Sequence, residues 1–69
     1  MTKPNLAATV DRLRKKRGMS QLRLARESGL SPSYVNDIVR GRKWRISAAT
    51  REKLSVALDI QPERLGDVS

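Results

Sequence analysis

The apolar residues of this 69-residue chain recur at helical spacing and are interrupted at short intervals by serine and glycine. Leu6, Val10 and Leu13 fall at i, i+4 and i+7, which places them on one face of a helix. No alternating run of Val, Ile and Thr bounded by turn residues is present, so no strand is predicted. The pattern predicts an all-α fold. One domain usually takes roughly 100–200 residues, so residues 1–69 are expected to form a single domain.

Capping residues divide the chain into five expected helical segments. Ser20, Ser31 and Ser47 are of a type that caps helix N-termini, and Pro32 suits a first helical position. Glycines suit helix ends because they adopt left-handed backbone angles. The expected helices span about residues 5–17 (Asn5 as N-cap, Gly18 after the end), 21–28, 32–40 (Gly41 after the end), 47–58 and a short fifth turn at 62–65. The second and third, joined by a tight turn containing Gly29, form a helix-turn-helix arrangement.

The expected inner faces follow from the same spacing. Leu24 and Ala25 are expected to face inward from the second helix. On the fourth helix, the inner face is expected to comprise Leu54, Ala57 and Leu58, with Ala48 and Arg51 one turn earlier. Residues 66–69 are expected to be frayed.

The composition excludes several kinds of chemistry. The chain has no cysteine and no histidine, which removes disulfides, thiol nucleophiles, ordinary zinc sites and imidazole catalysis. No pair of carboxylates falls on one buried face, so we expect no enzyme, no metal and no cofactor. Apolar runs reach only two or three residues, too short to span a bilayer. A soluble, cytoplasmic, nucleoid-associated protein with no membrane partner is expected.

Positive charge is concentrated in one part of the chain. Lys and Arg total 15 against 7 Asp and Glu, a net charge of +8. Residues 1–46 hold twelve of the basic and three of the acidic residues, whereas residues 47–69 hold three and four. Such segregation indicates a polyanionic partner, most commonly nucleic acid; solubility alone is the alternative. Of the basic run 14–17, part can serve the helix dipole, and a share is expected to face the polyanion.

The third expected helix has two unlike faces. At 100° per residue, Val35 and Ile38 lie on one side, flanked by Tyr34 and Val39. The opposite side carries short polar groups: Ser33, Asn36, Asp37 and Arg40. A recognition helix must pack on one side and present such groups to base edges on the other. The alternative is an ordinary polar surface.

Further residues are expected to hold the phosphate backbone. Gln21 and Arg23 stand at the start of the second helix, whose free N–H groups favour a phosphate. Arg42, Lys43 and Arg45 follow the third helix in a loop and are predicted phosphate clamps. Contacts of this kind fix register without reading sequence.

Two stretches carry a family resemblance: MSQLRLA at 19–25 and SGLSPSYVNDIVRG at 28–41. They resemble the lambda-repressor-like (Cro/repressor-type, xenobiotic-response-element or XRE) helix-turn-helix family. KLSVALDI at 53–60 and PERL at 62–65 are similar to that family's fourth and fifth helices, so the resemblance covers about residues 6–66. It implies a five-helix domain that binds operator DNA, usually as a dimer on a palindrome.

The resemblance also implies roles for individual residues. Gln21 matches the glutamine that anchors a phosphate, and Tyr34 matches a tyrosine that packs partly and reaches the DNA backbone. Ser33, Asn36 and Asp37 occupy positions that usually reach the major groove. Pro32 takes another such position but can at most touch a thymine methyl group.

Three residues depart from the family pattern. Asp37 could accept from cytosine N4 or could orient Arg40 one turn on. Leu22 stands where the family has a polar residue and is either an isolated surface leucine or part of an interface. Trp44 could cap the core, stack on the sugar–phosphate backbone or lie in a subunit contact.

The sequence therefore predicts a sequence-specific DNA-binding regulator, most simply a repressor that binds a palindromic operator as a homodimer. Val39, Trp44, Val56 and the C-terminal tail are candidates for the dimer surface. One alternative is an antitoxin of the same fold, with a toxin or co-regulator as protein partner. Another is a non-specific basic nucleic-acid-binding protein.

Overall fold

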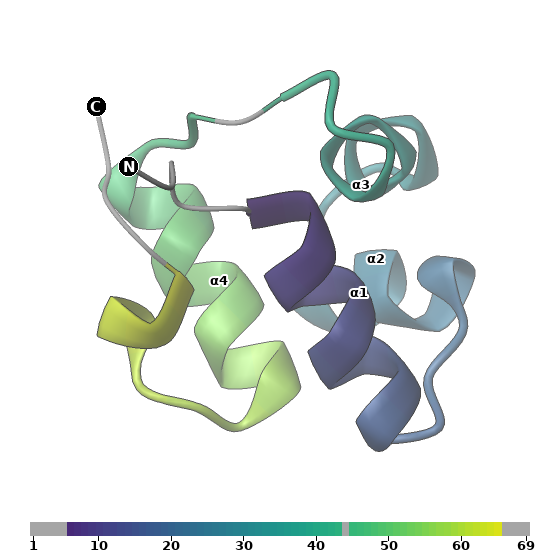
Figure 1. Ribbon diagram of the computed structural model, residues 1–69, viewed down its shortest axis with the longest axis horizontal. Coiled ribbons are helices and arrows are strands. Elements are labelled where there is room, and N and C mark those ends of the chain that lie inside the picture. Colours follow the sequence, from purple (N-terminus) through teal and green to yellow (C-terminus); the bar gives the residue numbers. More distant parts are fainter. Residues whose placement is uncertain (1–5, 44, 66–69) are drawn as a thin grey trace.

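The computed structural model describes residues 6–43 and 45–65, which form four α-helices and one short 3₁₀ helix (Figure 1). The elements are α1 (Leu6–Lys16), α2 (Gln21–Ser28), α3 (Pro32–Val39), α4 (Ala48–Leu58) and η1 (Pro62–Leu65). Within these two ranges there is no strand, and the all-α prediction is confirmed. The expectations for Asn5, Trp44 and residues 66–69 fall outside the described residues.

The short fifth turn expected at 62–65 is present as a 3₁₀ turn, so the described residues form four α-helices and not the five helices expected. Pro62–Leu65 forms a single 3₁₀ turn, in which the Arg64 N–H donates to the Gln61 carbonyl at 3.0 Å. Four residues are enough for one i→i+3 ring but too few to propagate α-helical bonds. Leu65 is buried against the core and holds this turn in place.

Serine hydroxyls begin three of the helices, as predicted. Each cap has extended backbone angles, and its Oγ accepts a hydrogen bond from the backbone N–H three residues on. The bonds run from Arg23 to Ser20 (3.0 Å), Tyr34 to Ser31 (3.1 Å) and Thr50 to Ser47 (3.2 Å). Each hydroxyl therefore satisfies one N–H group that the helix itself leaves without a partner.

A left-handed residue follows all four α-helices. Three of these are glycines (Gly18, Gly29 and Gly41) and the fourth is Asp59, with φ of 56°. After α2, the Leu30 N–H reaches back to the Ala25 carbonyl at 2.9 Å, which is the bond of a Schellman motif. The chain thus turns sharply at each helix end, and α2 and α3 are joined as a helix-turn-helix.

The core lies between the four α-helices: α3 packs on both α1 and α2, and α4 packs on α2 and η1 (Figure 1). Leu24 of α2 is fully buried and belongs to a hydrophobic cluster to which all five elements contribute side chains. α2 packs against both α3 and α4, whereas α3 and α4 barely touch. The members of the cluster are Leu6, Val10, Leu13, Met19, Leu24, Ala25, Val35, Ile38, Ile46, Leu54, Ala57, Leu58 and Leu65.

The expected inner face of α4 needs one correction. Leu54, Ala57 and Leu58 are buried as predicted, but Ala48 is exposed and Thr50 is buried in its place. At 100° per residue, Thr50 lies about 40° from Leu54 around the helix, whereas Ala48 lies about 120° away. Arg51 is partly buried.

No helix within residues 6–43 and 45–65 combines the length and the apolar character needed to cross a membrane.

Candidate nucleic-acid interface

The two faces of α3 differ as the sequence predicted. Val35 and Ile38 are fully buried, and Tyr34 and Val39 pack against the core from its edge. The opposite side forms an outward strip, in which Pro32, Ser33 and Arg40 are exposed and Asn36 and Asp37 are half-buried. The strip presents hydroxyl, amide, carboxylate and guanidinium groups on one side of a rigidly packed helix, as base-edge contacts require.

A hydrogen bond joins the outward strip to the start of α2. Asn36 Nδ2 donates to Gln21 Oε1 at 3.0 Å, so the two amides hold each other in position. After this bond, Asn36 keeps one N–H and its Oδ1, and Gln21 keeps its amino group. The sequence analysis named both residues but missed their contact, because fifteen positions separate them and only the packing of α2 on α3 brings them together.

Asp37 contacts Arg42 and not Arg40, which the sequence had offered as one of two alternatives beside cytosine N4. The Arg42 guanidinium lies 3.4 Å from an Asp37 carboxylate oxygen, and the Arg42 N–H donates to the Asp37 carbonyl at 2.8 Å. Gly41 has φ of 81° and reverses the chain, which returns Arg42 to the last turn of α3. In the sequence, Gly41 is the residue that indicates this contact, because it allows the chain to reverse; the i, i+3 spacing of Asp37 and Arg40 does not indicate it.

The three basic residues predicted to contact phosphates lie in the loop after α3. Arg42, Lys43 and Arg45 are exposed, and they follow the exposed Arg40. The Lys43 ammonium lies 5.5 Å from the centre of the Tyr34 ring, within the range of a cation–π contact. The positive charge of this loop is therefore gathered at the C-terminal end of the outward strip.

The start of α2 provides fewer free N–H groups than the sequence suggested. The Ser20 cap takes the Arg23 N–H, while the N–H groups of Gln21 and Leu22 precede the first intrahelical bond. The Arg23 guanidinium pairs with Glu27 at 2.6 Å along the helix. Leu22 is 54% exposed, next to Gln21.

Most of the basic run at the end of α1 has local partners. Arg14 donates to the Met19 carbonyl at 2.8 Å and pairs with Asp11, which also binds Lys15 at 3.1 Å. These hydrogen bonds, Arg14 first and Lys15 second, lower the pKa of Asp11. Farther along, Arg17 lies 3.7 Å from Asp59. The run therefore contacts α1 itself, the turn after it and the end of α4, with Lys16 exposed beside it.

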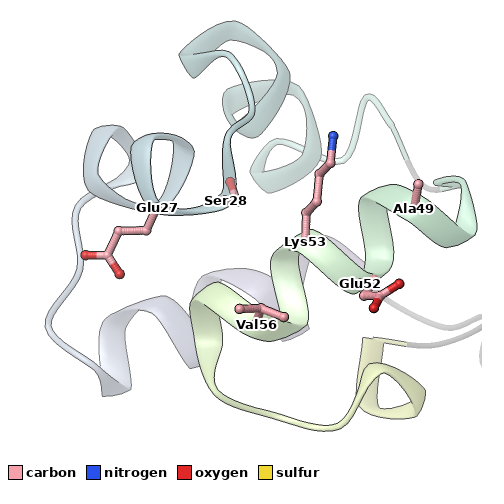
Figure 2. A pocket seen from close by; sticks show the side chains of 6 residues that line it. All are labelled: Glu27, Ser28, Ala49, Glu52, Lys53 and Val56. Carbon is pink, nitrogen blue, oxygen red and sulfur yellow. The ribbon is translucent and has the colours of Figure 1, made fainter.

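A hollow lies between α2 and α4, away from the outward strip of α3 (Figure 2). Glu27 and Ser28 of α2 and Ala49, Glu52, Lys53 and Val56 of α4 line it. Its charged side chains have mixed sign, in contrast to the basic loop after α3. Residues 6–43 and 45–65 contain no group of three or more His, Cys, Asp or Glu that could hold a metal ion.

The sequence and the fold of the chain match those of known proteins. A model of the helix-turn-helix family matches residues 10–65. The chain belongs to this family. The resemblance to XRE-type helix-turn-helix proteins that the sequence showed is confirmed, and the matched residues of this helix-turn-helix protein include α2, α3 and the turn between them.

Several relatives of this helix-turn-helix protein are regulators. The control protein C.BamHI of Bacillus amyloliquefaciens is 44% identical over 52 residues, which is 75% of this chain and 63% of that relative's length. The restriction-modification controller protein C.AhdI of Aeromonas hydrophila is 39% identical in its crystal structure, with a TM-score of 0.82 over 90% of this chain and 92% of its own. The N-terminal DNA-binding domain of SinR from Bacillus subtilis has a TM-score of 0.87 at 29% identity and 94% coverage of both chains.

Proposed function

We propose that this helix-turn-helix protein is a sequence-specific regulator of transcription that binds double-stranded DNA. The observation that carries the proposal is the outward strip of α3, which is locked to the start of α2 by the bond between Asn36 and Gln21. A preset pair of amides on a packed helix loses little conformational entropy on binding. The relatives support it, because C.AhdI is a restriction-modification controller protein and SinR has been seen in complex with DNA.

In the proposed complex, α3 enters the major groove and the residues around it hold the phosphates. Asn36 retains one N–H and one oxygen, the pair that adenine N7 and the N6 amino group require. Gln21 keeps its amino group for a phosphate. The proposed base contacts are Pro32, Ser33, Asn36, Asp37 and Arg40, and the proposed phosphate contacts are Gln21, Arg23, Tyr34, Arg42, Lys43 and Arg45.

The simplest regulator of this kind is a repressor, which blocks transcription by occupying an operator. It acts without catalysis, on the DNA of the cytoplasmic nucleoid. Binding as a dimer to a palindrome would place two half-sites with centres about 10 base pairs, or a multiple, apart. Val56 is 73% exposed on α4 and Val39 is half-buried on α3, so both are candidates for the dimer surface.

The test is selection of binding sites from random duplex DNA at about 150 mM salt, where non-specific affinity is typically only 10⁻⁴–10⁻⁶ M. We expect a palindromic consensus, and footprinting should show both half-sites protected together. If no sequence is enriched and binding simply weakens as the salt concentration rises, the proposal is contradicted and the protein binds nucleic acid non-specifically. A consensus that contains a single half-site, protected by one protein molecule, would contradict binding as a dimer but not sequence-specific binding.

A further inference from the structure

We propose that Asp37 is a specificity-determining residue that disfavours binding to non-cognate DNA. It does so by holding Arg42 in the free protein and by placing a carboxylate that only a base-edge donor can satisfy. This inference rests on the proposed function, since it assigns the sequence preference of the same strip. It concerns the one acidic group among the strip residues Ser33, Asn36, Asp37 and Arg40.

Stability of the fold does not account for Asp37. The residue lies in the last turn of α3, where the helix dipole favours cations and disfavours a carboxylate. Its pairing with Arg42 is a surface contact, with the two side chains 34% and 66% exposed, and such pairs contribute little. A carboxylate at this place therefore calls for an explanation in what the strip binds.

The ion pair sets a competition for Arg42. In the free protein the guanidinium lies 3.4 Å from the Asp37 carboxylate, and the backbone bonds after Gly41 hold the two residues together. A phosphate must draw Arg42 away from that carboxylate or leave the pair intact. In either case Arg42 adds less to binding of arbitrary DNA than an unpaired arginine would.

The released carboxylate then faces the base edges as an acceptor without a donor of its own. Guanine and thymine present acceptors in the major groove, and these repel it. Adenine presents its N6 amino group beside the N7 acceptor, whereas cytosine presents the N4 amino group alone and is the natural partner of a carboxylate. The sequence preference assigned to Asp37 is therefore a C·G pair at one position in each half-site, with an energetic penalty at other sequences.

The experiment compares the wild-type protein with Asp37→Asn, which keeps the size of the side chain and removes its charge. Glu52→Gln is the matched control, because it changes the net charge equally from α4, which barely contacts α3 (Figure 2). Asp37→Ser is a second variant should the asparagine unfold the protein. Thermal unfolding of each variant confirms that it is folded at the assay temperature.

The first measurement is affinity for random-sequence duplex DNA as a function of salt, which needs no knowledge of the operator. Asp37→Asn should bind random DNA roughly three- to tenfold more tightly, since a like charge near the phosphates is removed. Its plot of log K against log salt should steepen by up to about 0.9, the value of one additional phosphate contact. An affinity and slope equal to those of the wild type, or matched by Glu52→Gln, would overturn the competition for Arg42.

The second measurement is site selection with both proteins, followed by replacement of the selected cytosine with N4-methylcytosine. The wild type should prefer cytosine at one position per half-site and lose affinity on methylation, while Asp37→Asn should show neither effect. The same consensus for both proteins would overturn the cytosine assignment and leave the proposed function standing. No consensus for the wild type would remove the proposed function itself, and the cytosine assignment with it.

Discussion

At the scale of single residues, the chemistry of the proposed interface depends on pairs that sequence spacing only partly reveals. Helical periodicity predicted which side chains of α3 face outward, because it depends only on 100° per residue. It could not pair Asn36 with Gln21, since that contact arises from packing between helices. It also did not identify Arg42 as the contact of Asp37, because that contact depends on the chain reversal at Gly41 and not on i, i+3 spacing.

The amide pair should behave as one unit in DNA binding. Replacing Asn36 with alanine is expected to cost about 1–3 kcal/mol on the selected site and less on random DNA. Gln21→Ala should cost less when Asn36 is already alanine, because the two residues share one bond. Titrations of the two single variants and the double variant measure this coupling. Gln61→Ala, an exposed glutamine before η1, is the control. Additive losses would show that the pair does not act together on DNA.

Asp11 should make the stability of the protein depend on pH in the acid range. Its pKa is lowered in the folded state by the hydrogen bonds from Arg14 and Lys15. The carboxylate therefore contributes stability that is present above its unfolded pKa of about 3.9 and is lost as the pH falls through the folded pKa. Urea unfolding of the wild type and Asp11→Asn between pH 2 and pH 7 measures this. The difference between them should be largest at neutral pH and shrink in acid.

At the scale of elements, the helix boundaries follow from short local signals. Serine caps and left-handed ends were predictable because each depends on a few adjacent residues. The 3₁₀ geometry of η1 was not, since four residues starting with proline suit either kind of helical turn. The end of α4 was missed as a motif because its left-handed residue is Asp59 rather than glycine.

Gly29, which ends α2, should be costly to replace. Its φ of 73° is disfavoured for an alanine, although no atom within 4 Å would meet the added Cβ. Gly29→Ala is therefore expected to destabilise the fold by roughly 1–2 kcal/mol through backbone strain alone. Asp59→Asn is the control, because asparagine tolerates the same left-handed angles. Comparable losses of stability in the two variants, measured by thermal unfolding, would contradict this explanation.

At the scale of the whole molecule, α2 connects the proposed reading surface to the rest of the core. It packs on α3 on one side and on α4 on the other, and these two helices barely touch (Figure 1). Neighbouring leucines of α2 have opposite environments: Leu24 is 0% exposed and Leu22 is 54% exposed. α1 also packs on α3, so the position of α3 depends on how well both α1 and α2 are packed.

The two leucines should respond differently to truncation. Leu24→Ala should destabilise the protein by about 2–5 kcal/mol, because it removes buried methyl groups and leaves a cavity. The free energy of unfolding of a small domain is only roughly 5–15 kcal/mol, so the variant should also lose DNA binding at a lower temperature than the wild type does. Leu22→Ala should stay within about 0.5 kcal/mol of the wild type. Chemical denaturation of both variants measures the difference, and a large loss for Leu22→Ala would indicate that this side chain lies in an interface.

The capped ends of the helices also have a consequence for the speed of folding. Helices α1 to α4 are 11, 8, 8 and 11 residues long, and each ends at a left-handed residue close to it in sequence. Forming these helices therefore requires little closure of long loops. Small helical domains of this kind fold in microseconds to milliseconds. Ribosomes add only about 5–20 residues per second, so the chain would fold faster than it is synthesised. Folding would then add no maturation delay, and the concentration of folded chains would follow synthesis directly.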